Sequence, residues 1–164
     1  MKRVLTTLLL CLCIVPAVAV WAGDSKPSKH GLFPEELISM KELRKKQIKN
    51  DKFILFDARG KNTYDTGHIK GAILPLGMDY YQNEELFRAG IIKSPPDRDK
   101  TLVESMKKYP KDFPIITYCN DNCEAGAVLL LQIKRLGFTD VHALEEGFQS
   151  WQASGYPVFP KTHR

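Results

Sequence analysis

Two cysteines that lie four residues apart are the side chains in this sequence best suited to do chemistry. Cys119 directly follows the apolar run 115–118 (IITY), and Cys123 lies in the loop 119–124, before Ala125 begins a helical pattern. At a junction between a strand and a helix, the loop amides and the positive end of the helix dipole point toward one place. Such a site favours a thiolate over a thiol, so we predict that Cys119 is a nucleophile or carries sulfur as a persulfide. The alternative is a cysteine that only fills space at the end of a strand. The backbone amides predicted to surround the sulfur belong to Asn120, Asp121, Asn122, Cys123, Glu124 and Ala125.

The other side chains of this loop bear directly on that prediction. Cys123 is placed to attack a persulfide on Cys119 or to form a disulfide with it, which would make the pair a redox couple. Alternatively, Cys123 points into the core as a small hydrophobic side chain. Asp121 and Glu124 put two acids in the loop, and at about 4–6 Å each would oppose a thiolate by about a few kcal/mol.

The elements that must hold the loop are visible as short patterns. Three apolar runs have the form of strands buried on both faces: 53–56, 115–118 and 141–144. Helical spacing predicts helices over 83–89, 99–108, 125–136 and 147–154. Strands separated by helices indicate a single α/β domain, with an open, mainly parallel sheet that has helices on both faces.

A further helix is predicted before the first of these strands. Ser39 and Glu42 form a capping box, and Ile38 with Leu43 supplies the matching hydrophobic staple. A helix of about ten residues should follow and end near 50–51.

The amino terminus has the form of a secretory signal peptide. Lys2 and Arg3 precede an apolar stretch over 8–15, and small residues follow up to Ala22, where we predict cleavage. The apolar stretch is shorter than the roughly 20 residues that a spanning helix needs. We therefore predict residues 1–22 as a signal peptide and a periplasmic or secreted protein, with no spanning segment after cleavage. A membrane-tethered lipoprotein or an uncleaved anchor is the alternative.

Composition sets the limits for the rest of the chain. The 164 residues are 26% charged and 43% hydrophobic, which excludes a disordered tail, a coiled coil and a polytopic membrane protein. A net charge of +5 does not argue for nucleic acid, and we predict no nucleic-acid partner. We predict a flexible leader over 23–35, the domain over 36–158 with an irregular segment at 76–113, and a tail over 159–164. For the irregular segment we favour an insertion that packs against the edge of the sheet. The alternative is a segment that shapes the pocket or forms a partner surface, with Tyr80, Tyr81 and Phe87 as candidate contacts.

Three separated segments of the chain resemble the rhodanese-type sulfurtransferase domain. The first is 56–59 (FDAR) followed by 64–72 (YDTGHIKGA), the second is Tyr118 with Cys119, and the third extends over 137–158. The resemblance implies a single-domain rhodanese-like fold with Cys119 as the sulfur carrier. The thiolate would take the outer sulfur of a donor such as thiosulfate and pass it to a thiol or another nucleophile. A six-residue loop is typical of the sulfur-transferring members, whereas related phosphatases have one residue more.

The resemblance also implies roles for residues outside the loop. Asp57, Arg59, Asp65 and His68 match signature positions and are expected to provide scaffold hydrogen bonds and an internal ion pair. Trp151 belongs to the carboxyl-terminal signature. No metal and no cofactor are needed. The expected partners are a small sulfur-containing donor or a protein thiol or persulfide, and the protein is expected to be a monomer.

The loop departs from the family pattern, and this leaves three functions open. Many active members have a glycine inside the loop and an arginine at its end, where this chain has Asn122 and Glu124. Thiosulfate is a dianion and should be disfavoured by the acidic loop. The three hypotheses are an exported sulfurtransferase, a non-catalytic binding module for a partner or a sulfur or selenium species, and a thiol–disulfide redox protein that uses Cys119 and Cys123.

Overall fold

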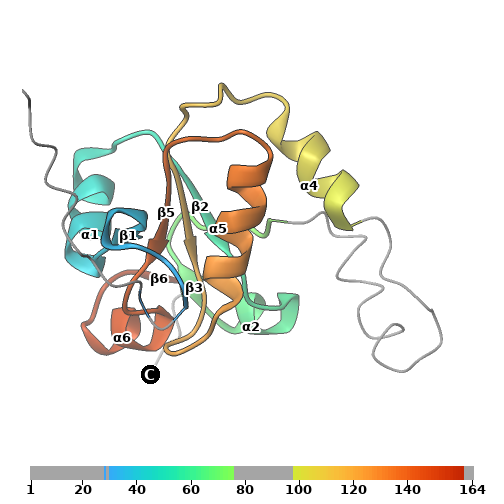
Figure 1. The fold of residues 1–164 in the computed structure, drawn as a ribbon. Helices are drawn as coiled ribbons and strands as arrows, with labels where there is room; N and C mark the ends of the chain where they lie inside the picture. The colour runs from blue at the N-terminus through green and yellow to red at the C-terminus, as the bar shows by residue number, and fades with distance from the viewer. Residues whose placement is uncertain (1–27, 29, 76–97, 161–164) are drawn as a thin grey trace, which may run out of the picture.

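The computed structural model describes residue 28 and residues 30–75 and 98–160 (Figure 1). The predicted signal peptide over 1–22, the helix over 83–89 and the three aromatic contacts Tyr80, Tyr81 and Phe87 lie outside the described residues. Within the described part of the chain, no helix is both long and apolar enough to cross a membrane.

Four parallel strands form the central sheet, in the order β1-β5-β4-β2. They are β1 (Leu37–Ile38), β2 (Ile54–Asp57), β4 (Ile115–Tyr118) and β5 (Val141–Leu144). All three predicted strands are present; β4 and β5 have the predicted bounds, and β2 begins one residue later than predicted. Two short strands, β3 (His68–Ile69) and β6 (Val158–Phe159), pair antiparallel beside it. Because each of these strands has only two residues, no apolar run in the sequence predicted them.

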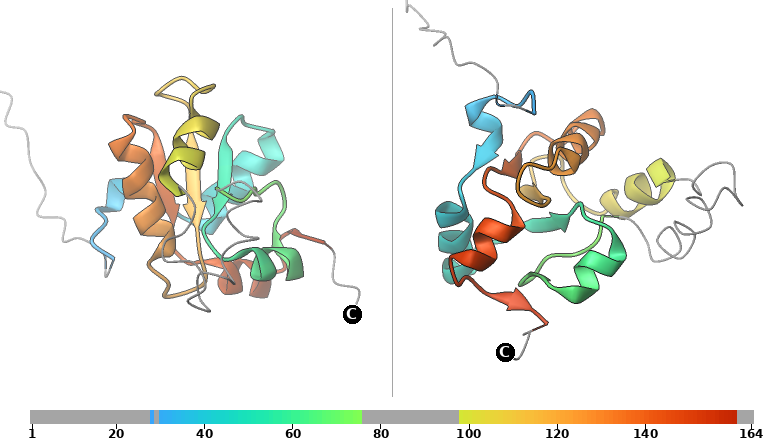
Figure 2. Two further views of the ribbon diagram at one scale, coloured as in Figure 1. Left: turned by 90° about the vertical axis from the view of Figure 1, so that its right-hand side faces the viewer. Right: turned by 90° about the horizontal axis from the view of Figure 1, so that it is seen from below.

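Helices cover both faces of the sheet, as the alternation of strands and helices predicted (Figure 2). Their bounds are α1 (Met40–Lys49), α2 (Lys61–Thr66), α4 (Arg98–Met106), α5 (Ala125–Arg135) and α6 (Phe148–Ala153). Ile115 and Ile116 are adjacent in β4 but belong to different apolar clusters, because successive side chains of a strand point to opposite faces. The cluster around Ile115 contains residues of α4 and α5, and the cluster around Ile116 contains residues of α1 and α6.

The predicted cap of α1 is confirmed in detail. The Ser39 hydroxyl accepts a hydrogen bond from the Glu42 amide at 3.3 Å, and the Glu42 carboxylate accepts one from the Ser39 amide at 3.1 Å. Ile38 and Leu43 are buried in one cluster, as a hydrophobic staple requires.

Both ends of the domain lie further out than predicted. Leu32 lies in the predicted flexible leader over 23–35, but it is 1% exposed and packs in the core, and a 3-10 helix, η1, follows at Pro34–Glu36. Phe159 lies in the predicted tail over 159–164, but it pairs with His68 in the small sheet. In both places isolated apolar side chains extend the fold into segments whose average composition is polar.

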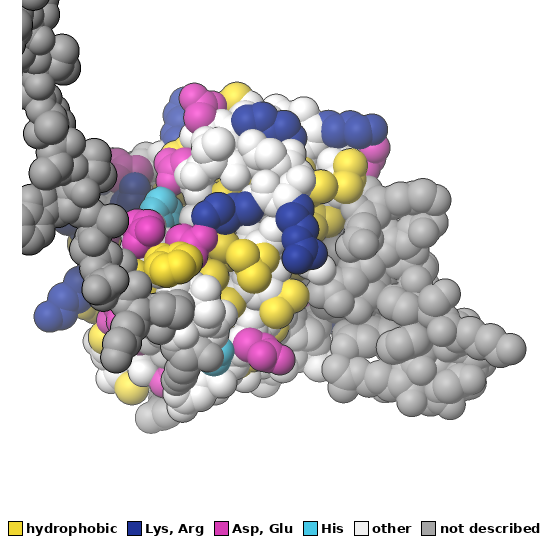
Figure 3. Space-filling view, in the orientation of Figure 1, with side chains coloured by type: hydrophobic (Ala, Val, Ile, Leu, Met, Phe, Trp, Pro, Cys, Tyr) yellow, Lys and Arg dark blue, Asp and Glu magenta, His cyan; other side chains and the backbone are white. Residues whose placement is uncertain are grey.

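The surface in Figure 3 shows basic and acidic side chains interspersed over the described residues of that face. Some of these charges form exposed pairs, such as Lys107 with Glu104 at 2.6 Å. Exposed pairs of this kind contribute little to stability.

Candidate active site

Cys119 lies at the carboxyl end of β4, directly before the loop 119–124. Helix α5 begins at Ala125 with Glu124 as its N-cap, so the six-residue count is confirmed. A Cβ atom at Gly126 would lie 3.3 Å from the Cys119 amide nitrogen and 3.2 Å from the carbonyl carbon of Tyr118. The first turn of α5 therefore packs against the backbone of Cys119, which places the positive end of the helix dipole at this cysteine.

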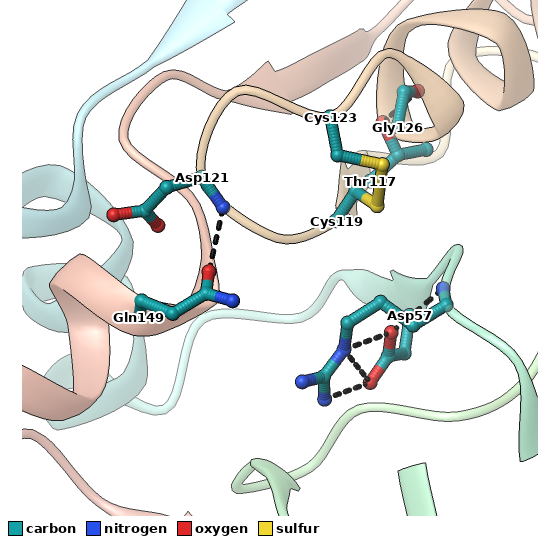
Figure 4. Close-up of a disulfide and its surroundings, with 8 residues drawn as sticks. Asp57, Thr117, Cys119, Asp121, Cys123, Gly126 and Gln149 are labelled. Atoms are coloured by element: carbon teal, nitrogen blue, oxygen red, sulfur yellow. Dashed lines mark hydrogen bonds and ion pairs between the residues drawn. A yellow bond between two sulfur atoms is a disulfide. The ribbon is translucent and has the colours of Figure 1, made fainter. Parts of the chain in front are cut away.

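Cys119 and Cys123 form a disulfide (Figure 4), with their Cα atoms 5.8 Å apart. Of the two predicted alternatives for Cys123, the structure shows the disulfide with Cys119 and not a side chain packed in the core. Cys119 is 7% exposed, whereas Cys123 is half-buried. Cys119, the cysteine predicted to be the nucleophile, is therefore oxidised in this structure.

A cavity of about 350 Å³ gives access to both cysteines. Its walls come from the loop, the start of α5, the end of β5 and the amino-terminal residues Ser28, His30 and Leu32. A second cavity of about 390 Å³ lies beside α1, and none of the described residues that line it is a cysteine. The cysteine predicted to be the nucleophile therefore lines the first cavity.

Asp121 does not face the sulfur atoms, which corrects the expectation of two opposing acids. Its carboxylate accepts hydrogen bonds from the Ser150 amide at 3.1 Å and from the Ser150 hydroxyl at 2.6 Å, in the first turn of α6. The carboxylate points away from the disulfide in Figure 4. Helix amino termini leave backbone N–H groups unsatisfied and attract negative charge, so this acid caps α6.

The predicted amide cradle is also smaller than the sequence indicated. The Asp121 amide donates to the Gln149 side-chain oxygen at 2.6 Å, and the Cys123 amide donates to the Asn120 carbonyl oxygen at 3.2 Å. Because these two N–H groups already donate to acceptors within the protein, they do not contribute to the predicted cradle for the sulfur anion. Glu124 is exposed, Asn122 adopts a left-handed conformation with φ 61°, and the buried side-chain oxygen of Asn120 has no hydrogen-bond partner in the described part of the chain.

Substitution of Asp121 tests whether its charge acts on α6 or on the sulfur. We expect Asp121→Ala to lower the free energy of unfolding by about 1 kcal/mol, and Asp121→Asn to leave it nearly unchanged, because asparagine caps about as well as aspartate. Neither variant should change the rate at which iodoacetamide alkylates the reduced protein at neutral pH by more than about twofold. A large rate increase in Asp121→Asn would show that the carboxylate faces the thiolate.

The strand ends that lead into the loop are held by a buried network. Asp57 accepts hydrogen bonds from Arg59 Nε at 2.8 Å and Nη2 at 2.6 Å, and from the Tyr118 hydroxyl at 2.6 Å. The Tyr118 oxygen in turn accepts from the Ile69 amide at 3.1 Å. Burial, and then the negative charge of Asp57, raise the pKa of Tyr118 above its usual value, so its hydroxyl remains a donor. Because Tyr118 precedes Cys119, this network positions the residue from which the loop departs.

The other signature residues also lie in the scaffold. Asp65 forms an exposed pair with Lys61, so it is not part of the buried ion pair of Asp57 and Arg59. The His68 ring stacks on Tyr64 with centroids 3.7 Å apart. Trp151 is fully buried, and its Nε1 donates to the carbonyl oxygen of Pro157 at 3.1 Å. None of the five signature residues singled out in the sequence lines the cysteine cavity.

Several residues of the site had no signal in the sequence. Ser28 and His30 lie in a polar segment without periodicity, and only Leu32 stands out there as apolar. Gln149 and Ser150 bind the loop from a helix that follows it by more than twenty residues. No group of three His, Cys, Asp or Glu side chains is placed to hold a metal ion among the residues that the structure describes.

Comparison with known proteins gives a consistent family and fold. A family model described as the rhodanese-like domain matches residues 39–154. A solved rhodanese-like domain from Anabaena is 20% identical, with a TM-score of 0.55, and the match covers 79% of this chain and 85% of that one. A Bacillus halodurans protein is 21% identical, with a TM-score of 0.56 and 76% of both chains covered. A Lactobacillus plantarum protein is 18% identical, with a TM-score of 0.52 and coverage of 76% and 87%. No curated protein sequence matches the chain.

Proposed function

Because the chain belongs to the rhodanese-like domain family, we propose that it is an exported sulfurtransferase that carries sulfur as a persulfide on Cys119. The observation that supports this most is the position of Cys119, at the carboxyl end of β4, against the first turn of α5 and on the wall of a cavity. In open α/β sheets, ligands bind in the crevice at the carboxyl ends of the strands. The partners in this proposal are a small sulfur donor or a protein thiol or persulfide, acting on a monomer.

The reduced form would do the chemistry in two steps. The Cys119 thiolate attacks the outer sulfur of the donor, the bond in the donor breaks, and the leaving group departs with the electron pair. An acceptor thiolate then attacks the outer sulfur of the persulfide, and Cys119 leaves as a thiolate. The dipole of α5 stabilises the anionic sulfur in both steps. Before this cycle, a dithiol must reduce the disulfide and is itself oxidised.

Export is proposed from the amino-terminal sequence. A charged pair, an apolar stretch and small residues precede residue 23, in the order of a secretory signal. A disulfide between Cys119 and Cys123 fits an oxidising compartment such as the periplasm.

A thiol–disulfide redox protein is the second candidate, and the Cys119–Cys123 bond favours it. In this function an external dithiol would reduce the bond and leave as a disulfide. The two functions share Cys119 but differ in their need for Cys123, and this difference can be tested.

Sulfur loading provides the test. We expect mass spectrometry of the reduced protein, after incubation with polysulfide or a cysteine persulfide, to show one added sulfur atom on the peptide that contains Cys119. Cys119→Ser should show none, and Cys123→Ser should keep the adduct. Thiosulfate should load more slowly than these donors, because Glu124 is exposed in the loop and thiosulfate carries two negative charges.

The remaining outcomes separate the other functions. Free thiols that stay unmodified with every donor would reject sulfur carriage. In that case, a measurable reduction potential of the Cys119–Cys123 pair would support the redox function, and an inert pair would leave a binding module.

A further inference from the structure

The residues before the family match form a turn on the wall of the cysteine cavity. The family model begins at residue 39, whereas the cavity is also lined by Ser28, His30 and Leu32. We call these residues, together with Gly31, the amino-terminal turn. It is closed by its own hydrogen bonds: the Ser28 amide donates to the Leu32 carbonyl oxygen at 2.6 Å, and the Gly31 amide donates to the Ser28 carbonyl oxygen at 2.9 Å. The Ser28 hydroxyl also accepts from the amides of His30 at 3.3 Å and Leu32 at 3.2 Å.

The amino-terminal turn is anchored to the rest of the domain. Leu32 is buried in the same apolar cluster as Leu130 and Ile133 of α5. Directly after the turn, Glu36 of η1 accepts a hydrogen bond from Lys134 at the end of α5. The turn therefore packs on the same helix whose first turn holds Cys119.

Among the described residues that line this cavity, His30 is the one basic side chain. The other ionisable residues of that described lining are Glu145, which is exposed, and the two cysteines once they are reduced. Asp121, the acid nearest in sequence to Cys119, has turned away to cap α6. A thiolate in the cavity would thus meet His30 as its basic neighbour. A positive charge close to a thiol favours the thiolate, and the effect is largest where water is partly excluded.

We propose that His30 is an electrostatic partner of Cys119, and that its protonated imidazole stabilises the sulfur anion in the cysteine cavity. The role concerns the thiolate itself, and its extension to a persulfide anion rests on the proposed sulfur carriage. The amino-terminal turn would then complete the active site of this chain from outside the matched family region. The stabilisation requires the protonated imidazole, so it weakens as the pH rises and the imidazole loses its proton.

Alkylation of Cys119 measures this effect directly. In a reduced Cys123→Ser background, iodoacetamide labelling of Cys119 is followed by peptide mass spectrometry between about pH 5 and pH 9. We expect His30→Gln to slow labelling by about fivefold near pH 6 and to have a progressively smaller effect toward pH 9, because only the protonated imidazole acts on the sulfur. His30→Lys carries a permanent charge and should keep labelling fast near pH 6 and accelerate it near pH 8.

His142→Gln is the matched control. His142 is also partly exposed, but it pairs with Asp140 at 3.3 Å and lines the other cavity, so this variant should label like the parent at every pH. The proposal is overturned if His30→Gln and the parent have superimposable profiles, or if their rates differ by the same factor at every pH. Labelling needs no sulfur donor, so the result is independent of whether Cys119 carries sulfur.

Discussion

Asp57→Asn is expected to lower the free energy of unfolding by about 3–5 kcal/mol, because it leaves the buried guanidinium of Arg59 without its counter-charge. Arg59 is 5% exposed, and its side chain donates three hydrogen bonds to the Asp57 carboxylate. The Arg59 carbon Cζ lies 3.7 Å from the centroid of the Phe148 ring of α6, so the ring packs on the guanidinium and contributes to its burial. A loss of this size is a large part of the 5–15 kcal/mol that stabilises a typical domain.

Urea denaturation, with the disulfide kept intact in all variants, measures this loss. Asp65→Asn is the matched control, since it removes the same charge from an exposed pair with Lys61. That variant should lose no more than about 0.5 kcal/mol. Equal effects of the two substitutions would contradict the buried network as the source of stability.

Gly147→Ala is expected to destabilise the protein by about 3–5 kcal/mol and to displace the cysteine loop. Gly147 has φ +92° and ψ −178°, a conformation that is essentially restricted to glycine. A Cβ atom there would lie 2.6 Å from the Asp121 amide nitrogen and 2.8 Å from the carbonyl carbon of Asn120. The backbone of the loop would have to move, and the hydrogen bond from the Phe148 amide to the Cys119 carbonyl oxygen, 2.9 Å long, would be strained.

Gly155→Ala separates backbone strain from the steric clash. Gly155 also has a positive φ, +70°, but a Cβ atom there would meet no atom of the described residues within 4 Å. Gly155→Ala should cost about 1–2 kcal/mol from the backbone alone and leave the proposed sulfur loading of Cys119 unchanged. Gly147→Ala should reduce loading as well, and if its loading equalled that of the parent, the close approach of Gly147 to the loop would be irrelevant to the site.

Features that depend on neighbouring residues could be predicted from the sequence. The capping box of Ser39 and Glu42 acts within one helical turn, and the apolar run 115–118 marks a strand buried on both faces. The length of the cysteine loop followed from these same local patterns, because one pattern ends at Tyr118 and the next begins at Ala125.

Contacts between distant segments could not be predicted in this way. By its sequence position Asp121 lies in the loop predicted to bind an anion. In the structure its carboxylate instead accepts hydrogen bonds from the amide and hydroxyl of Ser150, in the first turn of α6. Asp57 and Asp65 both match signature positions, but only Asp57 meets Arg59 and Tyr118 in the interior.

The sequence by itself thus determined the family, the parallel α/β architecture and the cysteine at the end of β4, because short-range patterning specifies strands, caps and loop length. Only the tertiary structure decided what surrounds that cysteine. In the folded chain Cys123 is bonded to Cys119, and the Asp121 carboxylate binds the start of α6. The amino-terminal turn, with His30, lines the cysteine cavity. The physical reason is that the sheet gathers segments far apart in the chain at one edge, where packing and charge select the neighbours of the sulfur.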